Sequence, residues 1–323
     1  MPADQGHLIH NNILERFARL NTSGRLAHAY LFVGPAGIGK RDTARAVAKL
    51  VNCLAPGGFR PGCDCASCRK TEAGNHPDVY VVHREADRQE LRAELIRDLM
   101  ERFNLRVWEG RMRVGIILNA EDMNTVAQSV FLKTLEEPAP KTLLILTASQ
   151  SGLLLPTIVS RCQPVYFFQL GYAELAEWIK NEYHVEPVEA AALARFGQGS
   201  PGRVRELGPG FLGTRNGIID EFIMARDGES AVKAYCADRD SARIFLEVIL
   251  TFFRDVTLIR RGLGAEYLIH ADRIEAARTL AARYSDEDLD RIVEQAVSAI
   301  RGAGEYMNVK VAVMLLKELM RKP

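Results

Sequence analysis

The sequence predicts an α/β domain that carries a phosphate-binding loop, followed by two all-helical domains. Three observations predict this fold. Strand-like and helix-like segments alternate over residues 1–167, which is typical of a parallel sheet with crossover helices. A glycine-rich loop, 34–41, joins a strand to a helix. Beyond the last strand only helical periodicity remains. We therefore expect an α/β domain over 1–168, a small helical domain over 169–210 and an all-helical C-terminal domain over 211–323.

Short apolar runs and amphipathic segments define the elements of the first domain. The predicted strands are 29–33, 78–83, 113–118, 143–148 and 164–168. The predicted helices are 10–22, 40–52, 87–103 and 124–137. Pro138 and Pro140 follow the last of these helices, and we expect them to end it.

The C-terminal half reads as helices joined by short loops. Gly208–Gly213 is rich in glycine and is the best candidate for a linker. Residues 216–321 look wholly helical, and the segment 241–261 is strongly apolar on one side. Ser285–Asp288 resembles a capping box that opens another helix.

Composition places the chain among ordinary globular proteins. Its 323 residues are 47% hydrophobic and 26% charged, with a formal net charge of +1. Strong nonspecific binding of nucleic acid by the isolated chain is therefore not expected. No apolar run approaches the length of a membrane span, and the first ten residues lack a signal-peptide pattern. We expect a cytoplasmic protein that makes no membrane contact.

The loop of Gly34, Gly37, Gly39 and Lys40 follows the phosphate-binding pattern G-x-x-x-x-G-K-[ST] up to its last position. In that pattern, backbone N–H groups surround a polyphosphate, the lysine adds positive charge, and the final hydroxyl binds Mg²⁺. Here Arg41 takes the last position and offers no lone pair to a metal. The residues leave open whether ATP occupies the loop. We expect any binding to be weak and little affected by Mg²⁺.

A second metal-handling position is also altered. In ATPases of this kind a strand ends in acidic residues that support Mg²⁺ and orient water. The matching strand, 113–118, ends in Leu118 and is followed by Asn119. Glu121 and Asp122 come later and are expected to face solvent, although one of them could serve as the acid. Two separate losses indicate a loop that does not support hydrolysis.

Four of the six cysteines lie close together in the sequence. Cys65 and Cys68 form a C-x-x-C turn, and Cys53 and Cys63 could complete a tetrahedral Cys₄ site for structural Zn²⁺. In a reducing compartment such a cluster favours metal over disulfides. Cys63 and Cys65 are separated by one residue, so one thiol of this pair could point away. The alternative is a set of reduced surface thiols.

Several segments resemble the delta-prime family of bacterial DNA polymerase III clamp-loader subunits, which are AAA+ proteins. The resemblance is dense from 24 to 205 and thin between 210 and 300. The segments that carry it are Gly24–Phe32, the cysteine insert, Gly74–Asp78, Met123–Asn124, Leu132–Pro138, Leu154–Gln163, Ser200–Arg203 and, more weakly, Met307–Leu316.

The resemblance implies an AAA+ fold with a helical lid domain (169–210) and a collar domain for oligomerisation (211–323). It implies a hetero-pentamer with motor (gamma- or tau-like) and delta-like subunits that loads a sliding clamp on primed DNA. In that family Arg161, within Ser160–Cys162, matches an arginine supplied in trans to a neighbour's ATP site. Arg203 matches a residue that senses nucleotide in its own subunit. The chain is then a non-hydrolysing subunit. The alternatives are an active motor ATPase of a clamp loader and a stand-alone AAA+ protein.

Overall fold

The computed structural model describes residues 10–85, 88, 90–208, 210–225, 228–236, 238–303 and 309–321. It separates into two compact units. The sheet unit comprises residues 1–170 with 200–202, and the helical unit comprises 171–199 with 203–323. The expected division into three domains, with a boundary at 210, stays a prediction.

The sheet unit contains five parallel strands in the order β2-β3-β4-β1-β5. Their bounds are β1 Ala29–Val33, β2 Val79–Val82, β3 Arg113–Ile117, β4 Thr142–Ala148 and β5 Gln163–Tyr166. All five therefore lie within a residue or two of the predicted strands. The register pairs Ala29 with Leu144 and Tyr30 with Gln163, so β1 lies between β4 and β5 and its carboxyl end has a neighbouring strand on both sides.

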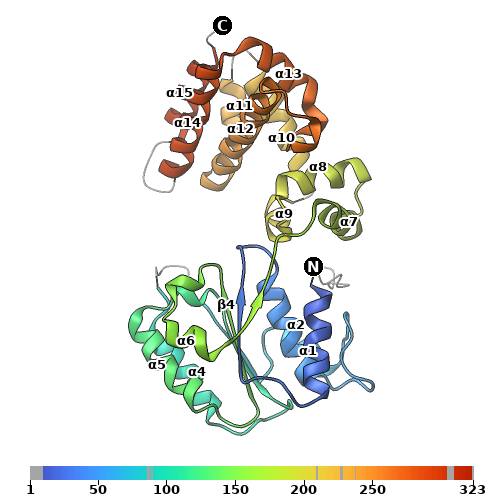
Figure 1. The fold of residues 1–323 in the computed structure, drawn as a ribbon, viewed down its shortest axis with the longest axis vertical. Coiled ribbons are helices and arrows are strands. Elements are labelled where there is room, and N and C mark those ends of the chain that lie inside the picture. The colour runs from blue at the N-terminus through green and yellow to red at the C-terminus, as the bar shows by residue number, and fades with distance from the viewer. Residues whose placement is uncertain are drawn as a thin grey trace. The chain divides into compact units, whose positions relative to one another are not determined.

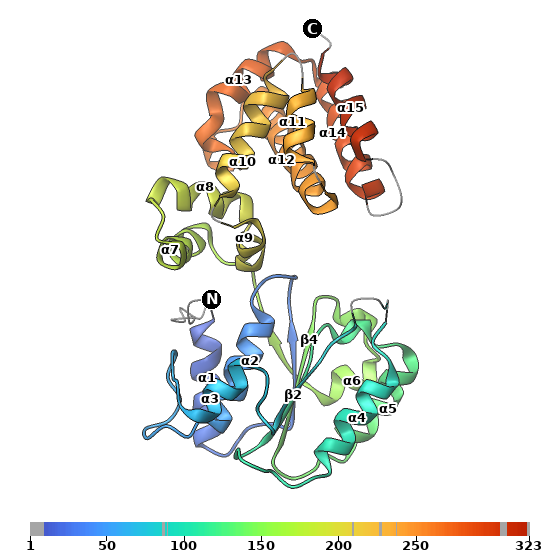
Figure 2. The same ribbon diagram turned by 180° about the vertical axis from the view of Figure 1, so that it is seen from behind.

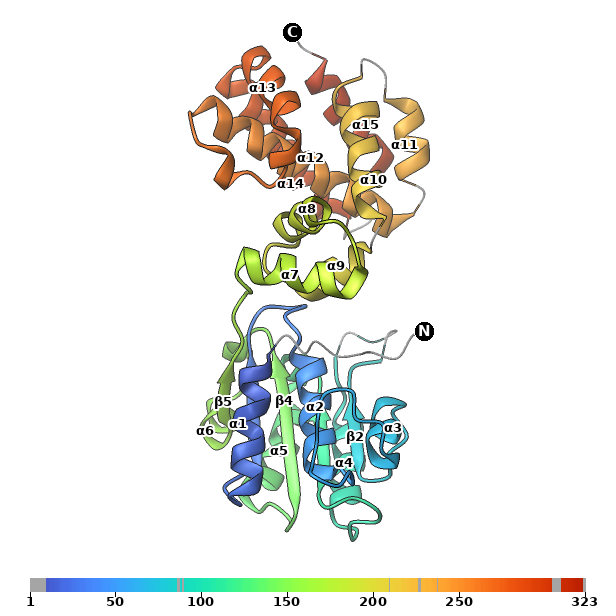
Figure 3. The ribbon, with the colours of Figure 1, turned by 90° about the vertical axis from the view of Figure 1, so that its right-hand side faces the viewer.

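Helices cover both faces of this sheet, as Figures 1–3 show. One layer contains α1 Asn11–Thr22, α2 Lys40–Asn52 and α3 Ala66–Glu72. The other contains α4 Ala93–Phe103, α5 Thr125–Glu136 and α6 Pro156–Arg161. Successive strand residues point to opposite faces of the sheet and contribute to two separate apolar cores, one under each layer of helices. The predicted helix 87–103 begins later than expected, because Leu91 forms a bridge with Met123. Part of its predicted first turn lies outside the described residues.

Among the described residues, the helical unit contains no strand. Its α-helices are α7 Tyr172–Tyr183, α8 Pro187–Gly197, α9 Pro201–Leu207, α10 Phe211–Gly217, α11 Glu229–Tyr235, α12 Arg239–Arg260, α13 Ile274–Arg283, α14 Asp286–Ala303 and α15 Val309–Met320. Shorter helical turns are η3 Ile218–Ile223, η4 Ala265–Tyr267 and η5 Ala271–Arg273. The linker predicted at Gly208–Gly213 is wrong in part, since its last three residues begin α10. Met307 and Asn308 of the C-terminal motif lie outside the described residues.

Helix α12 is the centre of the helical unit, where it packs against α13, α14 and α15. Its buried face includes Phe245 and Phe252, as the apolar pattern predicted, and also Phe253. The expected capping box is also present, because Ser285 Oγ accepts the Asp288 N–H at 3.2 Å and Asp288 Oδ2 accepts the Ser285 N–H at 3.2 Å.

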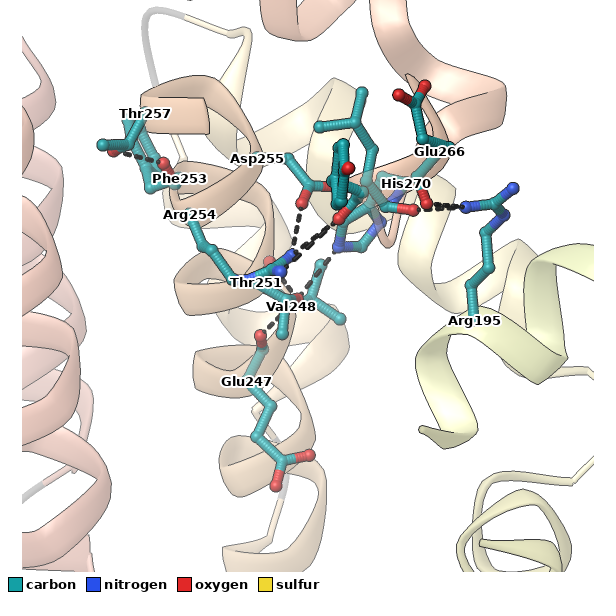
Figure 4. A network of polar contacts seen from close by, with 12 residues as sticks. Arg195, Glu247, Val248, Thr251, Phe253, Arg254, Asp255, Thr257, Glu266 and His270 are labelled. Atoms are coloured by element: carbon teal, nitrogen blue, oxygen red, sulfur yellow. Dashed lines mark hydrogen bonds and ion pairs between the residues drawn. The ribbon is translucent and has the colours of Figure 1, made fainter. Parts of the chain in front are cut away.

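A polar network joins α12 to α8 through the 265–270 segment (Figure 4). Buried Asp255 accepts the His270 N–H at 2.6 Å, and His270 Nε2 lies 2.9 Å from Thr251 Oγ1. Arg195 of α8 donates to the carbonyl of Leu268 at 2.9 Å. Burial lowers the pKa of His270 to about 3, so the ring is neutral near pH 7.

None of the helices in the described residues combines the length and the hydropathy that a membrane span requires.

Candidate nucleotide loop, cysteine cluster and interface arginine

The glycine loop connects β1 to α2 in the geometry of a phosphate cradle. Gly37 and Gly39 have φ values of 73° and 98°, the left-handed region that glycine adopts without strain. Gly34 packs against the backbone of Phe167 so closely that a Cβ would collide with it. The loop therefore requires its glycines. Because it leads into the N-terminus of α2, its backbone suits an anion.

Lys40 lies at the start of α2 and is only 6% exposed. Its Nζ donates to the carbonyls of Gly34 at 2.5 Å and Pro35 at 2.7 Å, and to Ser149 Oγ at 3.2 Å. Burial lowers the pKa of Lys40, and the nearby charge of Glu121 partly opposes this shift. The lysine is thus held by its own loop and by the end of β4.

Two other segments brace the loop through its carbonyl groups. His10 Nε2 lies 2.7 Å from the Ile38 carbonyl, and the His10 ring meets Phe167 edge-on at 4.7 Å. The Gly202 N–H donates to the Gly37 carbonyl at 2.7 Å. A Cβ on Gly202 would lie 2.6 Å from Gly37 Cα, so this contact requires glycine as well. These contacts fix the loop's shape independently of any metal ligand.

The two positions that would handle Mg²⁺ hold residues unsuited to it. Arg41 is exposed, and Leu118 is 8% exposed within the apolar core. Asn119 adopts a left-handed conformation, φ 49°, and its N–H donates to Thr147 Oγ1. Hydrocarbon at the end of β3 offers a metal no ligand atom.

Glu121 was expected to face solvent, and this expectation is wrong. The turn after Asn119 bends the chain back, so that Glu121 Oε1 accepts the Ser149 N–H at 2.7 Å. Its Oε2 is buried and lacks a hydrogen-bond partner in the described chain. Asp122 instead pairs with Arg84 at 3.3 Å. Glu121, one of the two acids that the sequence left open as an alternative, therefore lies near Lys40, and both side chains bond Ser149.

The four clustered cysteines come together in space. Their Sγ atoms all lie within 4.8 Å of one another, with Cys53 Sγ 3.7 Å from Cys63 and 3.9 Å from Cys65. Both members of the tight Cys63–Cys65 pair point into the cluster. Burial opposes ionisation of Cys65, yet N–H groups of Cys68 and Leu54 lower its pKa to about 6. Four thiols at this spacing fit a metal ion that prefers sulfur and tetrahedral geometry.

Arg161 is the last residue of α6 and its side chain is 37% exposed. Its guanidinium donates to Glu136 Oε1 at 2.8 Å and to the Thr157 carbonyl at 3.2 Å. The following residue, Cys162, is buried, which raises the pKa of its thiol to about 12. Cys162 therefore anchors the end of α6 in the core, while Arg161 faces outward.

Arg203 lies in α9 of the helical unit. It forms ion pairs with Glu206 at 2.8 Å and with Glu247 of α12. Glu206 belongs to α9 itself, so the contact with Glu247 is the one that ties α9 to the central helix. These contacts do not test the nucleotide-sensing role that the resemblance implied.

The chain is similar in sequence to two proteins of known name. The chain is 35% identical over 206 residues to DNA polymerase III subunit delta' of Pseudomonas aeruginosa, a match that covers 63% of each chain. It is 29% identical to the Bacillus subtilis protein of the same name over 295 residues, or 88% of each chain. The chain thus spans less than two thirds of the first relative and most of the second.

Solved structures support the fold. A DNA polymerase III gamma subunit-related protein of Thermotoga maritima superimposes with a TM-score of 0.50 at 16% identity, over 95% of this chain and 98% of that one. This likeness confirms the predicted fold, a parallel α/β sheet domain with a phosphate-loop connection followed by all-helical parts. The model of the family described as DNA polymerase III, delta subunit, matches residues 9–171. The chain therefore belongs to this DNA polymerase III subunit family.

Proposed function

We propose that this chain is a non-hydrolysing delta-prime subunit of a clamp loader, which supplies Arg161 to the ATP site of a neighbouring subunit. The observation that carries the proposal is the buried Leu118 at the end of β3, where hydrolysis needs an acid. Exposed Arg41 in place of a hydroxyl residue supports it. The names of the relatives supply the polymerase III context.

The proposed assembly is a hetero-pentamer in the cytoplasm. Motor (gamma- or tau-like) and delta-like subunits would be the partners, and the complex would place a sliding clamp on primed DNA. In our proposal 169–210 is the lid and 211–323 is the collar that joins the subunits. Arg203, bound by two carboxylates within the helical unit, would be structural rather than a nucleotide sensor.

Glu121 favours a second candidate, an active motor ATPase. Glu121 is half-buried with its Oε2 atom enclosed, and its charge raises the pKa of Lys40 against the effect of burial. In this second candidate Glu121 is the catalytic acid. The absence of a hydroxyl at Arg41 argues against it, because Mg²⁺ would lose that ligand.

ATP turnover separates the two candidates. The isolated chain, with primed DNA present, should show no turnover above that of Lys40→Ala. Adding it to purified motor and delta-like subunits should raise their DNA-stimulated ATPase. If the isolated chain shows clear turnover that both Lys40→Ala and Glu121→Gln abolish, the second candidate, an active motor ATPase, is correct instead.

We also propose that the cysteine cluster binds one structural Zn²⁺. The ion would join the end of α2 to the start of α3 and would supply about 10–16 kcal/mol to local folding. Metal analysis of the purified chain should find about one zinc. Cys68→Ser should release it, while Cys236→Ser, a buried cysteine in the other unit, should not. Zinc well below one per wild-type chain would contradict the site.

A further inference from the structure

The loop 104–112, between α4 and β3, is held in place by a buried carboxylate. Asp78 is 1% exposed, and it accepts the N–H groups of Trp108 at 2.8 Å, Glu109 at 2.8 Å and Gly110 at 2.7 Å. Burial by itself favours the neutral acid, but these three donors lower the pKa of Asp78 below its ordinary value. The charged form of Asp78 therefore organises the loop.

Asn52, at the end of α2, fixes the next two residues. Its Oδ1 accepts the N–H groups of Arg111 at 2.8 Å and Met112 at 2.9 Å, and its Nδ2 donates to the Met112 carbonyl at 2.9 Å. A Cβ on Gly110 would lie 2.6 Å from Asn52 Oδ1, so any larger residue there would push Asn52 out of these hydrogen bonds. Five successive N–H groups, 108–112, are thus bound by two buried side chains. Few conformations remain open to this segment of the loop.

This rigid loop and the end of α4 present apolar and basic side chains to solvent. Trp108 is 85% exposed and Leu105 is 64% exposed. The exposed side chains of Arg102, Arg106 and Arg111 surround them in sequence. Tryptophan and arginine carry much of the binding energy at protein interfaces. A surface that is already ordered also loses less conformational entropy on binding.

We propose that Leu105 and Trp108, with the three arginines, form a docking surface for an acidic, apolar segment of a partner polypeptide. The guanidinium groups favour carboxylates on the partner, and Leu105 and Trp108 favour apolar side chains on it. Single-stranded nucleic acid fits less well, because Leu105 offers no ring for stacking. A second copy fits less well too, because a two-fold contact would bring like charges together.

A displayed library of random peptides tests this chemistry with the full-length chain. Peptides selected on the wild type, after removal of those that bind Trp108→Ala, should combine Asp or Glu with bulky apolar residues. A synthetic consensus peptide should bind Trp108→Ala and Arg106→Glu at least about tenfold more weakly. Phe168→Ala is the matched control, because Phe168 is another exposed aromatic residue of the sheet unit. It should bind as the wild type does.

Tryptophan fluorescence locates the bound peptide. Trp178 is buried, so a Trp178→Phe variant leaves Trp108 as the single, exposed reporter. A tryptophan-free consensus peptide should shield Trp108 from acrylamide quenching. Failure to enrich peptides over Trp108→Ala, or enrichment of basic ones, would overturn the proposal. So would displacement of the peptide by a single-stranded oligonucleotide at lower concentration, or self-association of the wild type that Trp108→Ala abolishes.

Discussion

The nucleotide loop and the end of α6 place their cationic side chains in opposite environments. Lys40 is buried and donates to carbonyls of its own loop. Arg161 is more than a third exposed and is held by Glu136 on the protein surface. Lys40 therefore stabilises its own loop inside the protein, while Arg161 is accessible to a partner.

The difference separates features that internal packing explains from features that it does not. The loop conformation is stabilised by two contacts, from the Gly202 N–H to the Gly37 carbonyl and from His10 Nε2 to the Ile38 carbonyl. Neither contact needs a metal. Packing therefore accounts for the loop whether or not ATP is hydrolysed. Packing does not account for Arg161 in the same way, because an exposed ion pair contributes only about 0–1 kcal/mol. A role in another subunit's site would explain it.

Replacement of Arg161 should have the largest effect on activity. Arg161→Ala in a reconstituted loader should lower turnover at the neighbouring ATP site by about 10³-fold, because the transferring phosphoryl group loses a stabilising cation. Arg161→Lys should recover little of it, since an ammonium cannot form a bidentate contact. DNA-stimulated ATPase at saturating ATP provides the measurement.

The free energy of unfolding separates this role from a structural one. Arg161→Ala should change it by no more than about 1 kcal/mol, since the side chain makes one surface ion pair. Normal turnover by Arg161→Ala loaders would remove the proposed role. A large loss of stability would instead show that Arg161 belongs to the fold.

Lys40→Met should affect stability more than activity. It leaves the carbonyls of Gly34 and Pro35 without their donor, which costs about 1–3 kcal/mol in the free energy of unfolding. Turnover by the assembled loader should stay within about twofold of the wild type, since our proposal gives this loop no hydrolysis. Denaturant unfolding and ATPase assays measure the two quantities. Lys133→Met, an exposed lysine on α5, controls for the loss of charge and should leave both unchanged.

A drop in loader turnover with Lys40→Met as large as that with Arg161→Ala would erase the contrast between the two regions. The loop would then take part in hydrolysis, and Glu121 would become the first candidate for its acid.

The sequence predicted the sheet well because strand periodicity is local. In the sheet unit each apolar run that was predicted as a strand is a strand, and the glycine pattern of 34–40 correctly located the loop after β1. The clustering of Cys53 with Cys63 and Cys65 also followed from short spacing. These features depend on residues close together in the chain.

Features that depend on distant residues were missed. Glu121 turns inward because Asn119 adopts a left-handed conformation and the Ser149 N–H lies directly after the neighbouring strand β4. Nothing near Glu121 in the sequence indicates that partner. The role of Asp78 in ordering 108–110 likewise joins segments about thirty residues apart in the chain.

Magnesium should have only a small effect on nucleotide binding by the wild-type chain. Without a hydroxyl at position 41, we expect the affinity for ATP to change less than about twofold when Mg²⁺ is added. Arg41→Thr restores that ligand on an exposed position and should raise the Mg²⁺ effect to about threefold or more. Calorimetric titration with and without Mg²⁺ gives both ratios. Tight, Mg²⁺-dependent binding by the wild type would contradict our interpretation of the loop.

Glu136→Gln should produce a small change in turnover and would show how Arg161 is positioned. The carboxylate bonds the guanidinium at 2.8 Å in an exposed pair, so its charge should contribute at most about 1 kcal/mol to ordering the arginine. Turnover at the neighbouring site should therefore fall no more than about fivefold. Glu137→Gln, the next residue, is the matched control and should have no effect. A loss with Glu136→Gln equal to that with Arg161→Ala would mean that the ion pair itself, rather than the arginine alone, is what the neighbouring subunit recognises.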